Sequence, residues 1–379
     1  MALIDARNQF DIPADRAYLN SAFLGPLPTA AVAAGREALE SKARPWTVTT
    51  ESFFDPVDRL RDLVSRYLDG DADGIAVVPS VSYGIATAAA NVDIPPGSTI
   101  VVLAEQFPSN VYAWRTLAAN VGAEILTVHH GPDGWTPRVL EAIDGRTAVV
   151  AIEPAHWSDG TTVDLVSVGR AARAVEAALI VDVSQTLGAV AFPIADIAPD
   201  FVVGVGYKWL LGAYGNAFLW AAPDRRNGRP LEQCWMPREG SRDFSRLAHY
   251  TDAFRAGAAR YDAGQSASHV NIAASVAALE VLGQWSPAAV SAHAEVLTSD
   301  LIKRVSALGL TPPPADQRSP HIVGLHLPAD GPEPAELASA LGDAQVNVSI
   351  RGTALRVSTH VFNTPADIDR LVAVLEAQL

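Results

Sequence analysis

The feature that most constrains the fold is an alternation of short apolar runs and alanine-rich segments between about position 75 and position 220. Six apolar runs are candidate strands: STIVVLAEQ, AEILTVHH, TAVVAIEPAH, ALIVDVSQ, DFVVGVGY and NAFLWAAP. Between them lie NVYAWRTLAANVG, TPRVLEAIDG and VSVGRAARAVEA, which have helical spacing and glycine near several ends. Nearly continuous apolar strands that alternate with helices predict an α/β fold with a mainly parallel sheet covered on both faces.

The second half of the chain has a different texture. After about Asp224 comes a polar, arginine-rich stretch, DRRNGRPLEQCWMPREGSRDFSR, followed by a long alanine-rich helix in SASHVNIAASVAALEVLG. Two strand candidates, SPHIVGLHL and ALRVSTHVFN, and a last helix in PADIDRLVAVLEAQL complete the pattern. We predict an N-terminal arm over residues 1–30, a large domain over 31–258, and a connecting helix with a small domain over 259–379.

Composition narrows the function classes. The 379-residue chain has a net charge of −14 and no basic cluster, which argues against nucleic acid as a partner. Its one cysteine, Cys234, excludes an intramolecular disulfide framework, and its scattered histidines predict no metal site. The start lacks the apolar core of a signal peptide, and no run approaches the roughly 20 apolar residues that span a bilayer. We expect a cytoplasmic protein with no membrane contact.

Several familiar catalytic motifs are missing, among them a Walker-type phosphate loop, an HExxH pair and a GxSxG elbow. Instead, distinctive residues follow the ends of four predicted strands: Asp182 in LIVDVSQT, Lys208 in FVVGVGYKW, Ser82 in VVPSVSYG and Phe107 in VVLAEQFPSN. In parallel sheets, ligands bind beyond these carboxyl ends. Taken singly, each residue has an ordinary explanation: a helix cap for the aspartate and the serine, a solvated lysine, a core aromatic.

Together the four side chains meet the needs of one cofactor, pyridoxal phosphate. The cofactor needs a lysine for a Schiff base and a carboxylate that keeps its pyridine nitrogen protonated. It also needs a helix N-terminus for its phosphate and a flat side chain over its ring. Lys208, Asp182, Ser82 and Phe107 supply these in turn. Because an imine-forming amine must be available uncharged, the apolar neighbours of Lys208 suit this purpose.

The same residues resemble the class V aminotransferase family of fold-type I pyridoxal phosphate enzymes, which includes cysteine desulfurases, kynureninases and isopenicillin N epimerase-like proteins. The resemblance runs from YLNSAFLGPLP to RVSTHVFNTPADID, and its most specific part is DVSQTLGAV…VGYKWLLGAYG, in which Asp182 and Lys208 are 26 positions apart. It implies the fold-type I transferase fold, with a mainly parallel, seven-stranded type of sheet in a large domain and a smaller α+β C-terminal domain.

The resemblance also implies how the cofactor is held. Lys208 would form the internal aldimine and move the proton at Cα, and Asp182 would pair with the pyridinium nitrogen. Further cofactor contacts are implied for Ser82, Tyr83, Phe107, Gln185 and Tyr207, and for one of the pair His156 and Trp157. Gln265 and Ser266 match a segment that reaches the phosphate of a neighbouring subunit, which implies a homodimer with shared active sites.

The substrate side is implied in the same way. Arg356 matches the arginine that receives the α-carboxylate of an amino acid, for which a fork-shaped donor is suited; a surface ion pair is its alternative. Asn20 would line the substrate entrance. His360 and Asn363 are weaker candidates, since each could equally be a packed residue.

One departure from the family pattern bears on the reaction. Cysteine desulfurases and most selenocysteine lyases carry a mobile cysteine near the carboxylate-binding arginine, but RGTALRVSTHVFNTPADID has none, and Cys234 lies far away in sequence. A persulfide-forming desulfurase is therefore disfavoured. Phe107, Tyr207 and Arg356 keep kynureninase chemistry open, although Gln185 stands where kynureninases tend to have histidine.

We therefore expect an enzyme that binds a small amino acid as an external aldimine and forms a Cα carbanion. Cleavage on the Cβ side, of the C–S lyase type, is favoured over transamination. Kynureninase-like hydrolysis, epimerisation and decarboxylation are further alternatives. A catalytically silent binding dimer is the non-enzyme alternative, and the presence of both Lys208 and Asp182 argues against it.

Overall fold

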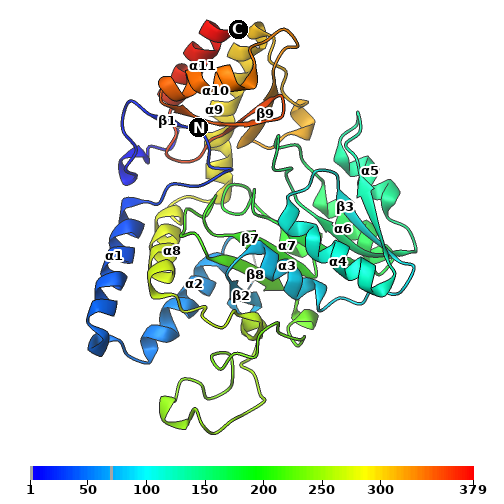
Figure 1. Ribbon diagram of the computed structural model, residues 1–379, viewed down its shortest axis with the longest axis vertical. Coiled ribbons are helices and arrows are strands. Elements are labelled where there is room, and N and C mark those ends of the chain that lie inside the picture. Colours follow the sequence, from blue (N-terminus) through cyan, green and yellow to red (C-terminus); the bar gives the residue numbers. More distant parts are fainter. Residues whose placement is uncertain (1–2, 69–70) are drawn as a thin grey trace.

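The computed structural model describes residues 3–68 and 71–379, and its centre is a seven-stranded sheet (Figure 1). The strand order is β2-β8-β7-β6-β5-β3-β4, and the neighbouring strands are parallel except in the two pairs that β8 forms. The strands are β2 (Ile75–Val78), β3 (Thr99–Leu103), β4 (Glu124–Val128), β5 (Thr147–Ile152), β6 (Ala178–Asp182), β7 (Phe201–Val205) and β8 (Ala217–Ala221). The mainly parallel α/β sheet that the sequence predicts is confirmed.

Helices cover both faces of this sheet because its strands are apolar on both sides. In β3, Val101 and Leu103 pack into one buried cluster, whereas Ile100 and Val102 pack into another on the opposite face. Successive side chains of a strand point to opposite faces, which explains the alternation. The covering helices are α2 (Asp55–Ser65), α5 (Trp135–Ala142), α6 (Leu165–Ala174) and α7 (Ile194–Ile197) on the first face, and α3 (Val81–Ala89) and α4 (Tyr112–Val121) on the second.

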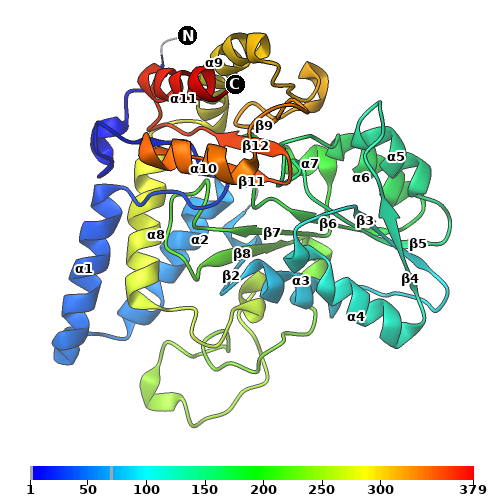
Figure 2. The same cartoon turned by 45° about the horizontal axis from the view of Figure 1, so that its top comes forward.

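The C-terminal part forms a smaller α+β unit, whose antiparallel sheet has the order β11-β12-β9 (Figure 2). Its elements are α9 (Pro287–Val305), β9 (Ile322–His326), α10 (Pro334–Asp343), β10 (Val346–Asn347), β11 (Ser349–Arg351), β12 (Ala354–Ser358) and α11 (Pro365–Gln378). The N-terminal segment joins this unit: β1 (Ala17–Tyr18) pairs with β10, and Leu19 lies in the same core as Leu355. The domain bounds given above stay a prediction.

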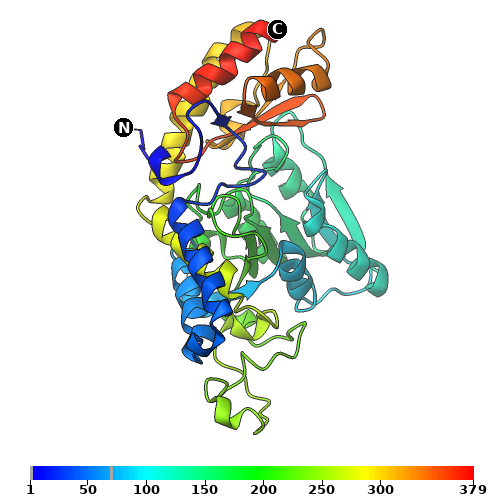
Figure 3. The same ribbon diagram turned by 60° about the vertical axis from the view of Figure 1, so that its left-hand side comes forward.

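Two long helices lie along one side of the molecule, where α1 (Thr29–Ala43) packs against α8 (His269–Leu282) (Figure 3). Between β8 and α8 the chain makes an excursion that protrudes at the end opposite the termini (Figure 1). Its exposed apolar side chains are Leu231, Trp235, Phe244, Leu247 and Tyr250. Within residues 3–68 and 71–379, no helix has the length and apolar character needed to cross a membrane.

Candidate active site

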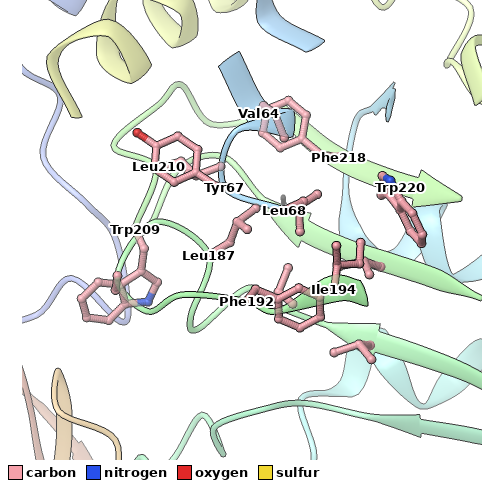
Figure 4. Packing of buried hydrophobic residues seen from close by; sticks show 14 of the residues in the cluster. Val64, Tyr67, Leu68, Leu187, Phe192, Ile194, Trp209, Leu210, Phe218 and Trp220 are labelled. Atoms are coloured by element: carbon pink, nitrogen blue, oxygen red, sulfur yellow. The ribbon is translucent and has the colours of Figure 1, made fainter. Parts of the chain in front are cut away.

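The loop that carries Lys208 is fixed between the core and the N-terminal segment. Trp209, the next residue, is buried in the cluster that contains Leu187 (Figure 4). From the other side, the amide of Gly25 donates to the Tyr207 carbonyl at 2.9 Å. A Cβ at Gly25 would lie 2.1 Å from the Lys208 carbonyl oxygen, so only glycine permits this approach. The backbone beside Lys208 is therefore held on both sides.

Lys208 and Asp182 line one cavity of about 280 Å³. Asp182 ends β6 and Lys208 follows β7, and the ends of these parallel neighbours meet at one edge of the sheet. Lys208 is 7% exposed and Asp182 3% exposed. The chain has three lysines, and the other two, Lys42 and Lys303, are exposed. Lys208 is therefore the one buried lysine of the chain.

The charges of this pair are shifted by burial. Burial lowers the pKa of Lys208 to about 8; Asp182 opposes this shift and Arg356 adds to it. Burial raises the pKa of Asp182, while Ser184, whose amide donates to Asp182 Oδ1 at 3.0 Å, acts to lower it. A larger share of the Lys208 amine is therefore uncharged near neutral pH than in an exposed lysine.

Hydroxyl groups gather at the N-terminus of α3. Ser80 caps the helix and accepts the Tyr83 amide hydrogen bond at 3.1 Å. Ser82 donates to Ser109 Oγ at 3.0 Å, and both serines line the cavity. Tyr83, which was also predicted to contact the cofactor, does not line the cavity. Burial and the nearby Glu232 charge raise the pKa of its hydroxyl to about 12. The helix end and its hydroxyls form an anion-binding arrangement.

Two aromatic side chains form a wall of the cavity. The Phe107 ring centroid lies 5.4 Å from Lys208 Nζ, and Trp157 packs edge-on against this ring at 5.6 Å. His156 turns away instead, stacks on Trp135 at 5.2 Å and has its Nε2 3.1 Å from the Ala104 carbonyl oxygen. Of the His156 and Trp157 pair, the structure places Trp157 at the cavity.

Gln185 and Tyr207 complete the lining near the lysine. Gln185 is held by two hydrogen bonds, one from its Nε2 to the Ala22 carbonyl at 3.2 Å and one from Trp209 Nε1 to its Oε1 at 3.1 Å. Tyr207 packs against Tyr214 with ring centroids 4.5 Å apart. Both side chains are positioned before any ligand binds.

Gln265 and Ser266 do not line the cavity of their own chain. Gln265 is exposed, whereas Ser266 is 6% exposed and its hydroxyl has no hydrogen-bond partner among the residues described. Their contact with the phosphate of a neighbouring subunit stays a prediction.

Arg356 lies in an adjoining cavity of about 370 Å³ that shares Phe107, Trp157 and Lys208 with the first. It is 1% exposed, and it donates to the Trp157 carbonyl at 2.6 Å and to Ser349 Oγ at 3.3 Å. Both partners are neutral, and no described carboxylate pairs with it. Burial lowers its pKa to about 10. A buried guanidinium without a counterion is suited to bind a carboxylate.

The other predicted substrate residues serve as supports. Asn20 does not line either cavity, but its Oδ1 accepts from Ser349 Oγ at 2.8 Å and so holds a partner of Arg356. His360 is fully buried, stacks on Trp209 and has its Nε2 3.0 Å from the Trp209 carbonyl oxygen. Asn363 accepts from the His360 amide at 2.9 Å. The structure does not bring His360 or Asn363 to either cavity.

Sequence reasoning missed two charged residues. Glu153 follows β5 directly and lines the first cavity. Arg351 lines the second, and its guanidinium lies 5.5 Å from the Trp157 ring centroid. The sequence held a signal for each residue. Glu153 comes at the end of an apolar run, as Asp182 does. Arg351 is five positions before Arg356, and both lie on the β11–β12 hairpin, in which Arg356 pairs with Ser349.

A buried lysine and carboxylate at the carboxyl edge of a mainly parallel sheet, beside an anion-binding helix end, define a fold-type I pyridoxal phosphate enzyme. The model of the aminotransferase class-V family matches residues 18–371. The chain belongs to this family, and its cofactor is pyridoxal phosphate. The cavity fits the cofactor, since an amine, a buried acid and a helix N-terminus with hydroxyl groups all line it.

Similarity to individual proteins is low in sequence and high in structure. A probable cysteine desulfurase from Methanothermobacter thermautotrophicus is 23% identical over 398 residues, covering 98% of this chain and 97% of that protein. A kynureninase from Burkholderia mallei is 27% identical over 245 residues, 61% of this chain and 57% of that enzyme. The solved complex of the cystine C-S lyase C-DES with cysteine persulfide has a TM-score of 0.85 at 17% identity, covering 96% of this chain and 97% of that one.

Proposed function

We propose that the protein cleaves a bond on the Cβ side of a small amino acid, as a lyase of the C–S type. One arrangement carries the proposal: a buried amine, Lys208, and a buried carboxylate, Asp182, share a cavity whose neighbour holds the unpaired Arg356. The names of two similar proteins, a probable cysteine desulfurase and a cystine C-S lyase, support this reaction type.

Each side chain has one task in this proposal. Uncharged Lys208 would accept the proton from the substrate Cα and pass it to the sulfur group that departs from Cβ. Asp182 would keep the ring nitrogen of the cofactor protonated, Ser82 and the α3 N-terminus would hold its phosphate, and Phe107 would pack against its ring. Arg356 binds the substrate α-carboxylate. Bound pyridoxal phosphate supplies an electron-accepting ring that stabilises negative charge at Cα.

Sulfur acceptance by the protein itself is not part of the proposal. Cys234 Sγ donates to the Gly264 carbonyl at 3.4 Å, and this residue lines neither the Lys208 cavity nor the Arg356 cavity. The sulfur fragment is therefore released rather than transferred to a cysteine of this chain.

Kynureninase-type hydrolysis is the second candidate. An aromatic wall of Phe107, Trp157 and Tyr214 could hold the aryl group of such a substrate, and a kynureninase is among the similar proteins. Transamination and epimerisation use the same Lys208 proton transfer and rank below it.

We also propose a homodimer. The exposed apolar side chains of the excursion between β8 and α8 would be covered in such an assembly. Analytical ultracentrifugation tests this: a monomer at micromolar concentration would contradict it. The cytoplasmic location stays a prediction.

A product panel tests the reaction. The loaded enzyme is incubated separately with L-cystine, L-cysteine, L-kynurenine and L-alanine plus a keto acid, and pyruvate, sulfide, anthranilate and amino-group transfer are measured. We expect pyruvate from a sulfur-containing substrate, none with Lys208→Ala, and unchanged rates with the exposed-lysine control Lys303→Ala. Amino-group transfer without pyruvate would contradict the lyase proposal, and anthranilate would favour the second candidate.

A further inference from the structure

Glu153 is a buried acid that the proposed reaction does not use. It follows the last residue of β5, is 3% exposed and lines the same cavity as Lys208 and Asp182. Its Oε1 has no hydrogen-bond partner among residues 3–68 and 71–379. A buried polar atom without a hydrogen-bond partner costs stability. The missing partner of Glu153 Oε1 is therefore expected to be a molecule that binds in the cavity.

The strand register brings Glu153 beside Asp182. Ile152 of β5 pairs with Val181 of β6, and the two acids are the next residues on these parallel strands. The other charged or titratable groups that act on Glu153 are Lys208, Asp159 and His156, whose Nε2 lies 3.9 Å from Glu153 Oε1. Burial lowers the pKa of His156, so this ring does not supply a balancing positive charge near neutral pH.

Two neighbouring carboxyl groups that are both almost fully buried do not both ionise readily, because like charges repel more strongly inside a protein than in bulk water. Burial and the Asp182 charge raise the pKa of Glu153 well above its usual range. Lys208 acts to lower the pKa of both acids, but Asp182 Oδ1 also accepts the Ser184 amide at 3.0 Å, whereas Glu153 Oε1 has no described hydrogen-bond partner, so Asp182 is better supported as an anion. The negative charge therefore belongs to Asp182 and the proton to Glu153.

We propose that Glu153 is a neutral carboxylic acid that donates its O–H hydrogen bond to the molecule bound in the cavity. A protonated carboxyl group is a donor, and its free oxygen finds no partner in the described chain, so the acceptor comes from the occupant. A neutral Glu153 also leaves one negative charge opposite Lys208, which keeps the amine easier to deprotonate. The inference rests on the cavity being the cofactor site and not on the type of reaction.

Cofactor affinity provides the first test. Pyridoxal phosphate is titrated into the apo-protein and its dissociation constant is measured by absorbance. Glu153→Gln keeps an N–H donor of the same shape, so we expect an affinity within about twofold of the wild type. Glu153→Leu has no donor, and the loss of one hydrogen bond should weaken binding by about tenfold. Equal weakening by both variants, or none by Glu153→Leu, overturns the proposal.

Two readouts on folded wild type and Glu153→Gln keep the test decisive if Glu153→Leu does not fold. Infrared difference spectra at pH 7.5 (roughly physiological) should show the C=O stretch of a protonated carboxyl group that Glu153→Gln removes.

The pH dependence of imine formation by the apo-protein reports the pKa of Lys208. Glu153→Gln should leave this pKa unchanged, whereas Asp182→Asn should lower it by about one unit. A missing infrared band, or a lowered pKa in Glu153→Gln, would falsify the assignment. Neither readout depends on turnover, so failure of the lyase proposal is separately visible.

Discussion

Two arginines of this protein are almost fully buried, and their surroundings differ. Arg61, on α2, is 6% exposed and forms a two-pronged ion pair with Asp262, with an Nη1–Oδ1 distance of 3.0 Å. Asp262 Oδ1 also accepts from the Val77 amide at 2.8 Å, which ties the segment before α8 to β2. Although burial acts to lower it, the Asp262 charge and hydrogen bonds raise the pKa of Arg61.

Arg356 is equally buried but has only neutral partners, and burial lowers its pKa to about 10. The comparison shows which of the two buried arginines is available to bind a ligand. The charge of Arg61 is compensated by a carboxylate of the folded chain, Asp262, whereas the β11–β12 hairpin leaves a guanidinium for a ligand to compensate. Three variants probe this difference, ordered by their expected effect on stability.

Breaking the internal pair should have the largest effect. Arg61→Met leaves Asp262 buried without its counterion, and we expect a loss of about 3–5 kcal/mol in the free energy of unfolding. Urea denaturation of the holoenzyme measures it. Arg59 lies on α2 like Arg61, but its ion pair with Glu280 is exposed. Arg59→Met is therefore the matched control and should cost less than about 1 kcal/mol. Similar losses for both variants would show that burial of the pair does not matter.

Lys208 is the intermediate case, because Asp182 acts on it without closing an ion pair. Its pKa is lowered from 10.5 to about 8 in the folded apo-protein, so between these pH values the unfolded chain binds more protons at this position. The contribution of Lys208 to stability therefore rises with pH across this window. Relative to wild type, apo Lys208→Met should be more stable at pH 7 by up to about 3 kcal/mol, at roughly 1.4 kcal/mol per pKa unit, and the gap should close toward pH 10. A gap that does not change with pH contradicts this expectation.

Arg356 should have the smallest effect on stability and a large effect on binding. Arg356→Met removes an uncompensated buried charge but also two hydrogen bonds to neutral partners; these effects oppose each other, so the free energy of unfolding should change by less than about 1 kcal/mol. The affinity for an amino acid, followed by the absorbance of the bound cofactor, should fall by about 100-fold, and Arg356→Lys should recover part of it. A stability loss as large as that of Arg61→Met would mean that Arg356 is a structural residue.

The sheet and the lysine–carboxylate pair could be predicted because both depend on local pattern. Six apolar runs are strands, and the residues that end them in a parallel sheet must share one edge. Asp182, Lys208, Ser82 and Phe107 line one cavity for this reason. The reversal of β8 was not predicted, since a buried strand has the same composition in either direction.

Side-chain direction could not be predicted so well. Ser82 and Tyr83 are neighbours on α3, and successive helical residues point about 100° apart, so with Ser82 at the cavity Tyr83 turns aside. His360 comes just after β12, and Asp182 is the last residue of β6, so both lie at a strand end. Trp209, however, stacks on His360 and keeps it in the core. Glu153 was missed because an acid after a strand is usually a turn or cap residue, and only its burial beside Asp182 distinguishes it.

The distance along the chain between Lys208 and Arg356 matters while the protein is being made. The hairpin arginine is synthesised 148 residues after the lysine. At about 5–20 residues per second, that delay lasts roughly 7–30 s on the ribosome. Every residue that lines the Lys208 cavity lies between positions 79 and 215, so all of them are synthesised before Arg351 and Arg356 of the adjoining cavity. If Arg356 binds the substrate carboxylate as proposed, the part of the site that selects amino acids is the last to be made.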